Sequence, residues 1–237
     1  MMTQRTAVIT GAGSGMGRSI SLLLAKEGFH IVLVGKTESK LLTVAEEIKT
    51  QGGSSSIQAF DITESDKVKA MADALSDTTI DVLVNCAGDW LIKTIDETTD
   101  ADLDHILGVN LKAPYLLSRD LLPHLRKSDN ASIINIGSMA AINSFGGISA
   151  YTAAKTGLRG LTGSLADELR PELIRVVMLS PTPANTPMRW DASPDMDRKM
   201  LVEPETIAQI VSVIVNLPKG ITISDMLLGS MLLDMSE

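Results

Sequence analysis

The chain has 237 residues, of which 44% are hydrophobic and only 3% aromatic, and its formal net charge is −8. This length and apolar content suit one α/β domain with a large buried core. The acidic balance argues against nucleic acid and anionic membranes as main partners, and the scarcity of aromatic side chains argues against a base-stacking platform.

The cysteine and histidine content limits which disulfides and metal sites can form. Cys86 is the one cysteine, so no internal disulfide can form, which suits a reducing cytoplasm. His30, His105 and His124 are scattered without cysteine partners, and we expect no metal site. The first expected strand starts so close to Met1 that we expect no signal peptide, and no apolar segment is long enough to span a bilayer. These features predict a cytoplasmic protein.

Strand-like and helix-like patterns alternate along the whole chain. Short runs of Val, Ile and Leu, typical of strands buried on both faces, are followed by stretches of helical period. The alternation predicts a doubly wound α/β fold, a seven-stranded parallel sheet with helices on both faces, as a single domain over 1–237. The expected strands are Ala7–Thr10, His30–Val34, Ser56–Phe60, Asp81–Asn85, Ser132–Ile136, Ile174–Leu179 and Asp225–Leu228, and the expected helices are Gly15–Glu27, Ser39–Gln51, Ser65–Ser76, Asp100–Arg126, Ser149–Arg170 and Pro204–Asn216.

Two segments are expected to be irregular. The run Gly52-Gly53-Ser54-Ser55-Ser56 is typical of a surface turn. The stretch after the sixth strand, about 181–203, mixes four prolines with several apolar side chains. It lies at the edge where open α/β sheets bind ligands, so we interpret it as a mobile substrate lid, with an ordinary irregular loop as the alternative.

The first strand and first helix are joined by a glycine-rich turn, TGAGSGMGRSI, from Thr10 to Ile20. Glycine allows positive φ and close backbone approach, and a helix starting there directs free N–H groups and its positive dipole end towards a phosphate. The spacing differs from the usual G-x-G-x-x-G because Met16 stands where the last glycine is expected. The turn predicts dinucleotide binding, and a merely flexible turn is the alternative.

Two further segments carry groups suited to proton transfer. Tyr151 and Lys155 are four residues apart at the start of an expected helix, so they share one face, where the ammonium lowers the pKa of the phenol. Ser138 ends the strand of the run SIINIGSMAA, where its hydroxyl can bond a substrate oxygen. The alternative for Tyr151 and Lys155 is a surface pair without a catalytic role, and the alternative for Ser138 is an ordinary turn serine.

Taken together and in this order, these parts resemble the short-chain dehydrogenase/reductase family over nearly the whole chain. The matching parts are the glycine turn, Asp61 after the third strand, Asn85-Cys86-Ala87-Gly88 after the fourth, then Asn110, Ser138 and Tyr151-x-x-x-Lys155. The chain also resembles the 3-oxoacyl-ACP reductases of this family, but the matching parts are general to the family. The resemblance implies a Rossmann-like fold, a nicotinamide dinucleotide cofactor and a small carbonyl or alcohol substrate.

The resemblance also implies a catalytic tetrad. Tyr151 is the expected acid in reduction and base in oxidation, Ser138 orients the carbonyl oxygen, Lys155 holds the nicotinamide ribose and lowers the pKa of Tyr151, and Asn110 anchors a water. Pro114 lies four residues after Asn110 and has no N–H to bond its carbonyl, so the helix is expected to kink there.

For the cofactor, the resemblance implies contacts from Asp61 to the adenine amino group and from Thr186 to the nicotinamide carboxamide. Cys86 replaces a usual asparagine, and Thr182 replaces the usual glycine after Pro181. The full expected set of cofactor-binding residues is Gly11, Ser14, Gly15, Met16, Gly17, Lys36, Thr37, Asp61, Ile62, Asn85, Ala87, Gly88, Tyr151, Lys155, Pro181 and Thr186.

The end of the second strand predicts which dinucleotide is preferred. An acidic residue usually binds the ribose of NAD at this position, which here is Gly35, followed by Lys36 and Thr37. A lysine ammonium and a threonine hydroxyl can bind a 2′-phosphate, although Lys36 can also be a solvated turn lysine. Ser14 stands where many NADP-preferring relatives carry a second basic residue. We expect NADP(H) to be preferred and NAD(H) to be accepted more weakly.

The leading hypothesis is an NADP(H)-dependent oxidoreductase acting on a ketone, aldehyde or secondary alcohol. The alternative is a catalytically silent dinucleotide-binding sensor or scaffold, which the presence of both Tyr151 and Lys155 argues against. The family resemblance implies a homotetramer, or else a dimer, built on the helices Asp100–Arg126 and Ser149–Arg170. Their apolar residues are expected to face another subunit and include Leu111, Tyr115, Leu116, Leu122, Leu158, Leu161 and Leu165, and the candidate pocket residues are Trp90, Met139, Phe145, Met188 and Trp190.

Overall fold

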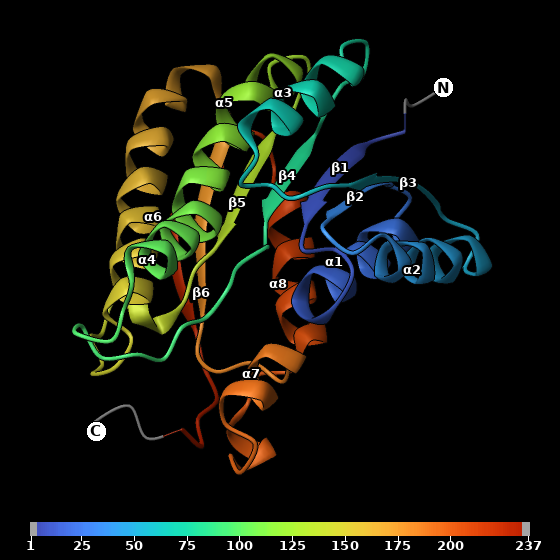
Figure 1. Cartoon of the computed structure of the whole chain (residues 1–237). Helices are drawn as coiled ribbons and strands as arrows, with labels where there is room; N and C mark the ends of the chain where they lie inside the picture. The colour runs from blue at the N-terminus through green and yellow to red at the C-terminus, as the bar shows by residue number, and fades with distance from the viewer. Residues whose placement is uncertain (1–3, 234–237) are drawn as a thin grey trace.

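The computed structural model describes residues 4–233, apart from the side chain of Ala192. One sheet of seven parallel strands runs through the molecule in the order β3-β2-β1-β4-β5-β6-β7 (Figure 1). This confirms the predicted fold class. The strands are β1 Thr6–Thr10, β2 His30–Gly35, β3 Ser54–Ala59, β4 Val82–Asn85, β5 Ser132–Ile136, β6 Arg175–Pro181 and β7 Asp225–Leu228.

Helices cover both faces of the sheet (Figure 1). Successive strand residues point to opposite faces, so Ile9 and Leu33 pack with one helical layer while Val8 and Leu83 pack with the other. The first layer contains α1 Gly15–Lys26, α2 Glu38–Thr50 and α8 Pro204–Val215, and the second contains α3 Ser65–Ala74, α5 Ala113–Leu125 and α6 Ser149–Glu168, with α4 Asp100–Leu107 beside α6. Within residues 4–233, no helix combines the length and apolar character needed to cross a bilayer.

The sheet reverses its strand order between β1 and β4, and this reversal places the site. Open α/β sheets bind ligands in the crevice beyond the carboxyl ends of the strands at such a point. Thr10, the last residue of β1, accepts hydrogen bonds from the backbone N–H groups of Cys86 and Ala87, each at 3.0 Å. The threonine of the glycine turn therefore fixes the turn after β4 against the end of β1.

The long helix expected over Asp100–Arg126 is two helices joined by a π-helical turn, Gly108–Lys112. Pro114 cannot donate a hydrogen bond, and just before it the N–H of Ala113 bonds the carbonyl of Gly108, five residues back. The irregularity expected at Pro114 is therefore present as a widened turn, and it contains Asn110.

Two other expectations need correction or refinement. The serines of the Gly52–Ser56 cluster are not a turn, because β3 begins at Ser54 and the His30 ring of β2 lies 3.1 Å from both Ser54 Oγ and Ser56 Oγ. Pairing with β2 overrides the local turn propensity. The segment predicted as a lid contains a short helix, α7 Pro187–Ala192, and its base is joined by hydrogen bonds between Asn185, Val202 and Pro183.

Candidate active site

The glycine turn forms a hollow of about 300 Å³ at the carboxyl ends of β1, β2 and β4. Gly15 has a φ of +49°, and a Cβ on it would lie 3.1 Å from Cγ2 of Thr186. A Cβ on Gly17 would overlap the carbonyl oxygen of Gly11. A side chain at Gly15 would fill the hollow, and one at Gly17 would push α1 away from β1, so these residues keep the start of α1 open to a ligand.

At the outer rim of this hollow, the Lys36 ammonium lies 3.0 Å from the Asp61 carboxylate. Asp61 also accepts hydrogen bonds from the backbone N–H and the hydroxyl of Thr63. The hydrogen bonds from Thr63, reinforced by Lys36, lower the pKa of Asp61 to about 2. The Lys36 side chain is exposed, and its charge is already matched by a carboxylate.

A second pair of polar side chains lines the same hollow and was missed from the sequence. His105 Nε2 of α4 lies 2.7 Å from Asp89 Oδ2, in the segment after β4. Val109, one helical turn after His105 and within the π-helical turn, also lines the hollow. Nothing in the spacing of these residues from the glycine turn signals that they meet there.

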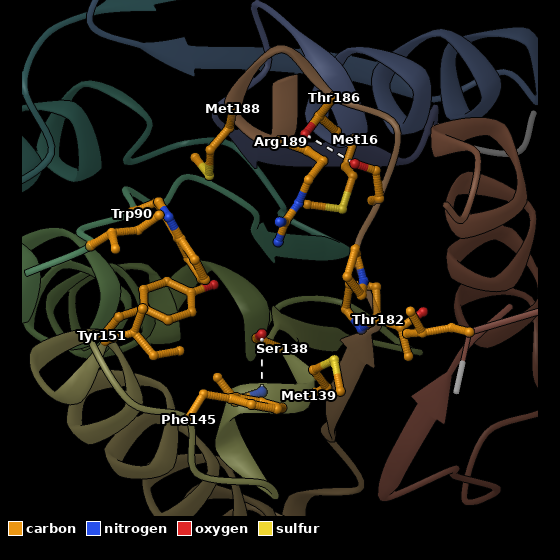
Figure 2. Close-up of a pocket in the computed structure, with 18 of the residues that line it drawn as sticks. Met16, Trp90, Ser138, Met139, Phe145, Tyr151, Thr182, Thr186, Met188 and Arg189 are labelled. Atoms are coloured by element: carbon orange, nitrogen blue, oxygen red, sulfur yellow. Dashed lines mark hydrogen bonds between the residues drawn. The ribbon is translucent and has the colours of Figure 1, made fainter. Parts of the chain in front are cut away.

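A second cavity of about 430 Å³ adjoins this hollow, and Met188 and Arg189 of α7 are among the residues that line it (Figure 2). Ser138 reaches it from the end of β5 and Tyr151 from the first turn of α6. Four of the five pocket residues expected from the sequence line its walls. These are Trp90, Met139, Phe145 and Met188.

Tyr151 is held against the cavity wall by packing. Its ring lies 4.7 Å from that of Trp90, at an interplanar angle of 66°, and only 8% of the residue is exposed. Burial raises the pKa of Tyr151 to about 12, although the Ser138 side chain and the positive charge of Arg189 act to lower it. At neutral pH Tyr151 is therefore a neutral phenol that has a proton to donate.

Lys155 lies behind Tyr151 on the same face of α6 and is buried. Its ammonium donates a hydrogen bond of 3.0 Å to the carbonyl of Ile136 and lies 5.7 Å from the centre of the Tyr151 ring. Burial lowers the pKa of Lys155 to about 8. The expected lowering of the Tyr151 pKa by Lys155 is not found in this structure, because the lysine is bound to β5 instead.

Asn110 is fully buried in the π-helical turn. Its Nδ2 donates to the carbonyls of Asp89 and Ile106, while Oδ1 is buried with no hydrogen-bond partner in the described part of the chain. A Cβ on Gly88 would lie 2.8 Å from this Oδ1 and 3.6 Å from the Lys155 ammonium. A free acceptor and a buried donor thus face the same glycine.

Comparison with known proteins agrees with this geometry. A model of the short chain dehydrogenase family matches residues 5–197. The chain belongs to this family. An uncharacterized oxidoreductase of Staphylococcus aureus strain MRSA252 is 29% identical over 227 residues, 95% of this chain and 96% of that protein.

Solved structures of the short-chain dehydrogenases are also similar. A metagenomic short-chain oxidoreductase in complex with NADP is 35% identical, with a TM-score of 0.84 over 96% of this chain and 97% of that one. A dehydrogenase/reductase from Sinorhizobium meliloti 1021 is 30% identical, with a TM-score of 0.88 over 97% and 96%. The chain is therefore an oxidoreductase of the short-chain dehydrogenase family.

Most of the cofactor residues predicted for this short-chain dehydrogenase surround the first hollow. These are Gly11, Ser14, Gly15, Met16, Gly17, Lys36, Asp61, Ile62, Ala87, Gly88 and Thr186. Pro181 instead lines the second cavity, which Met16 and Thr186 also line. Three predicted residues line neither hollow. Asn85 is buried and donates to Asn135 Oδ1 at 2.8 Å, Thr37 occupies the N-cap of α2, and the buried Lys155 donates to the Ile136 carbonyl.

The unusual Thr182 of this family member is accommodated without positive φ. Its N–H donates to the Leu228 carbonyl at 2.8 Å, so it extends the pairing of β6 with β7. A Cβ on Gly229 would lie 2.8 Å from the Thr182 methyl group. Glycine at 229 therefore provides the room that the side chain at 182 requires, and Thr186 still reaches Gly15.

Of the two α7 residues predicted to line the pocket, Met188 does so and Trp190 does not. Its indole N–H donates to Asn185 Oδ1 at 2.8 Å, at the base of the segment predicted as a lid. The neighbouring Arg189 lines the cavity instead, and it was not predicted (Figure 2). A helix assigned to Pro187–Ala192 would have signalled that adjacent residues face different ways.

Proposed function

We propose that this short-chain dehydrogenase is an NADP(H)-dependent oxidoreductase that reduces a ketone or aldehyde, or oxidises a secondary alcohol. The observation that carries the proposal is the position of Tyr151 and Ser138 on one wall of a cavity that shares Met16, Thr186 and Met188 with the glycine-lined hollow. A proton donor, a carbonyl-orienting hydroxyl and a dinucleotide cradle therefore meet at one place.

Tyr151 moves the proton in this reaction. As a neutral phenol with a raised pKa it donates its proton to the substrate oxygen during reduction, and in oxidation it takes the proton back. Ser138 holds the same oxygen, because its Oγ is fixed at the end of β5 by accepting the N–H of Ala140 at 3.1 Å. Asn110 and Lys155 complete the tetrad, with the unpartnered Oδ1 of Asn110 as an acceptor for the water of the proton relay.

The first hollow fits a nicotinamide dinucleotide. The start of α1, with Gly15 and Gly17, takes the pyrophosphate, Asp61 and Ile62 take the adenine, and Thr186 and Pro181 take the nicotinamide end. Lys155 holds the nicotinamide ribose. When bound, the dinucleotide supplies or accepts the hydride.

NADP(H) is the preferred cofactor in this proposal. Gly35 stands where an NAD enzyme usually carries the acidic residue that would repel a 2′-phosphate, and Lys36 supplies a positive charge next to it. The NADP complex of the metagenomic relative supports the same preference. Since Lys36 is already paired with Asp61, a 2′-phosphate must compete for it, and NAD(H) is bound more weakly rather than rejected.

The assembly proposed is a homotetramer, with a dimer as the alternative, in the cytoplasm. Tyr115 of α5 is 52% exposed and suits a subunit interface, whereas Leu116 and Leu158 are buried in the chain's own core and do not. Leu111 also packs within the chain, beside Gly157 of α6. Light scattering at micromolar concentration tests the assembly, and a monomer contradicts it.

Incubation with NADPH and a panel of ketones and aldehydes tests the activity. We expect NADPH absorbance to fall with at least one carbonyl compound, and the loss to require Tyr151. Binding of NADPH without oxidation by any member of the panel would favour the sensor or scaffold instead.

A further inference from the structure

Arg189 is the one charged side chain among the described residues that line the substrate cavity. It extends from α7 into the cavity, on the side where Trp90 and Met188 lie (Figure 2). The other walls are mostly apolar and come from Met16, Met139 and Phe145. A guanidinium in such surroundings loses hydration, which is costly unless an anion compensates for the loss.

No carboxylate of the described chain provides that compensation. The guanidinium donates a hydrogen bond of 3.2 Å to Ser193 Oγ and lies 5.4 Å from the centre of the Trp90 ring. Burial lowers the pKa of Arg189, while Tyr151 acts to raise it. Six other arginines do have carboxylate partners: Arg18, Arg119, Arg126, Arg159, Arg170 and Arg198.

A second donor on the same wall lacks an acceptor. The indole Nε1 of Trp90 is buried and has no hydrogen-bond partner among the described residues. Trp90 also touches Tyr151, the proposed proton donor, through its ring. Unmatched donors beside the reacting group favour a ligand that brings acceptor oxygens and negative charge.

We propose that Arg189 binds a carboxylate of the substrate, so that the compound reduced or oxidised is an oxo acid or a hydroxy acid. The inference rests on the proposed function and names its substrate class. One cation matches one negative charge, and the planar guanidinium fits the two oxygens of a carboxylate. A phosphate dianion would leave charge unmatched in this cavity.

The cofactor is the other source of anionic oxygens near α7. Arg189 lines the substrate cavity and not the hollow formed by the glycine turn, whereas its neighbours Pro187 and Met188 line that hollow. This position favours the substrate over the pyrophosphate as the partner of Arg189.

Calorimetric binding to the enzyme saturated with NADP⁺ tests the proposal without turnover. The probes are phenylacetate and hydrocinnamate, each compared with its neutral amide. We expect wild type to bind at least one acid about tenfold to a hundredfold more tightly than its amide, and Arg189→Met to lose this preference. Arg189→Lys keeps part of it. Arg198→Met keeps all of it, because Arg198 lies in the same segment 181–203 but is exposed and pairs with Glu203.

Three results overturn the proposal: no acid preference in wild type with either probe, the same preference in Arg189→Met, or weaker NADP⁺ binding in Arg189→Met with the acid preference intact. The last result would assign the guanidinium to the cofactor. A turnover arm compares benzoylformate and levulinate with their methyl esters. If no carbonyl compound is reduced, the proposed function fails, while the calorimetric result still decides the role of Arg189.

Discussion

Two adjoining hollows of this molecule differ in whether their charged side chains have partners within the described chain. In the glycine-lined hollow, Lys36 is matched by Asp61 and His105 lies against Asp89. In the substrate cavity, Arg189 has no carboxylate among the described residues. The first hollow already contains counter-charges with which a ligand must compete, whereas the second lacks one that a ligand can supply.

The hollows also differ in what forms them. The shape of the glycine-lined hollow, the proposed cofactor side, is set mainly by the backbone. It depends on the turn at Gly11, Gly15 and Gly17 and on the Thr10 contacts to the turn after β4. The substrate side depends on side chains such as Tyr151 and Arg189, which come from separate segments. Substitutions on the two sides should therefore have separable effects, on cofactor affinity and on turnover or substrate choice.

The largest effect is expected on the substrate side. Tyr151→Phe removes the proton donor while keeping the packing on Trp90, so kcat should fall about a hundredfold or more with NADPH affinity almost unchanged. Steady-state kinetics and NADPH titration measure the two quantities. Tyr115→Phe, at the exposed and only other tyrosine, is the matched control. Near-normal turnover of Tyr151→Phe would refute the assignment.

A substitution in the glycine turn should instead lower NADPH affinity. Alanine at Gly15 must adopt a φ of +49° and place its Cβ 3.1 Å from Thr186. We expect NADPH affinity to fall about tenfold, because a non-glycine residue in the left-handed region costs about 1–2 kcal/mol. Gly160→Ala, where a Cβ meets nothing within 4 Å, is the control and should leave binding unchanged. Equal affinities in both variants would show that Gly15 is not part of the cradle.

The same contrast explains what could be predicted from the sequence. The parallel sheet follows from alternating patterns, and its geometry brings the ends of β1 and β4 together, so Gly11 and Gly88 could be placed at one edge. Helical spacing likewise placed Tyr151 and Lys155 on one face. These predictions depend on backbone periodicity, which a single sequence contains.

What could not be predicted depends on the direction of individual side chains. Arg189 and Trp190 are neighbours in α7, yet one faces the cavity and the other bonds Asn185. The spacing of Lys155 from Tyr151 likewise gives no sign that the Ile136 carbonyl of β5 takes its hydrogen bond. Such choices depend on distant segments, so they need the folded arrangement.

The preference for NADPH over NADH tests the paired charges of the glycine-lined hollow. Wild type should use NADPH about tenfold better than NADH, since one charge-assisted contact is worth about 1.5–3 kcal/mol and here Asp61 competes for Lys36. Gly35→Asp/Lys36→Ala should shift the preference towards NADH, and a Cβ at Gly35 would lie 3.2 Å from Cδ2 of Leu41. The ratio of kcat/KM for the two cofactors measures this, with Lys49→Ala as control. A wild type that prefers NADH would show that Lys36 is only a surface charge.

The smallest effect is expected on the pKa of Tyr151, which the positive charge of Arg189 lowers. Oxidation of an alcohol needs Tyr151 as the phenolate, so activity rises with pH through its pKa, which burial raises and the charge of Arg189 lowers. Arg189→Met removes that charge, raises the pKa of Tyr151 further and should move the rising limb for a neutral alcohol such as cyclohexanol to higher pH. Arg189→Lys keeps a positive charge and should restore the limb towards its wild-type position, and Arg198→Met should not move it. A neutral alcohol is required because a bound carboxylate would itself cancel the charge. An identical pH profile in Arg189→Met and wild type would mean that the guanidinium does not influence Tyr151 and that the two groups serve the substrate independently.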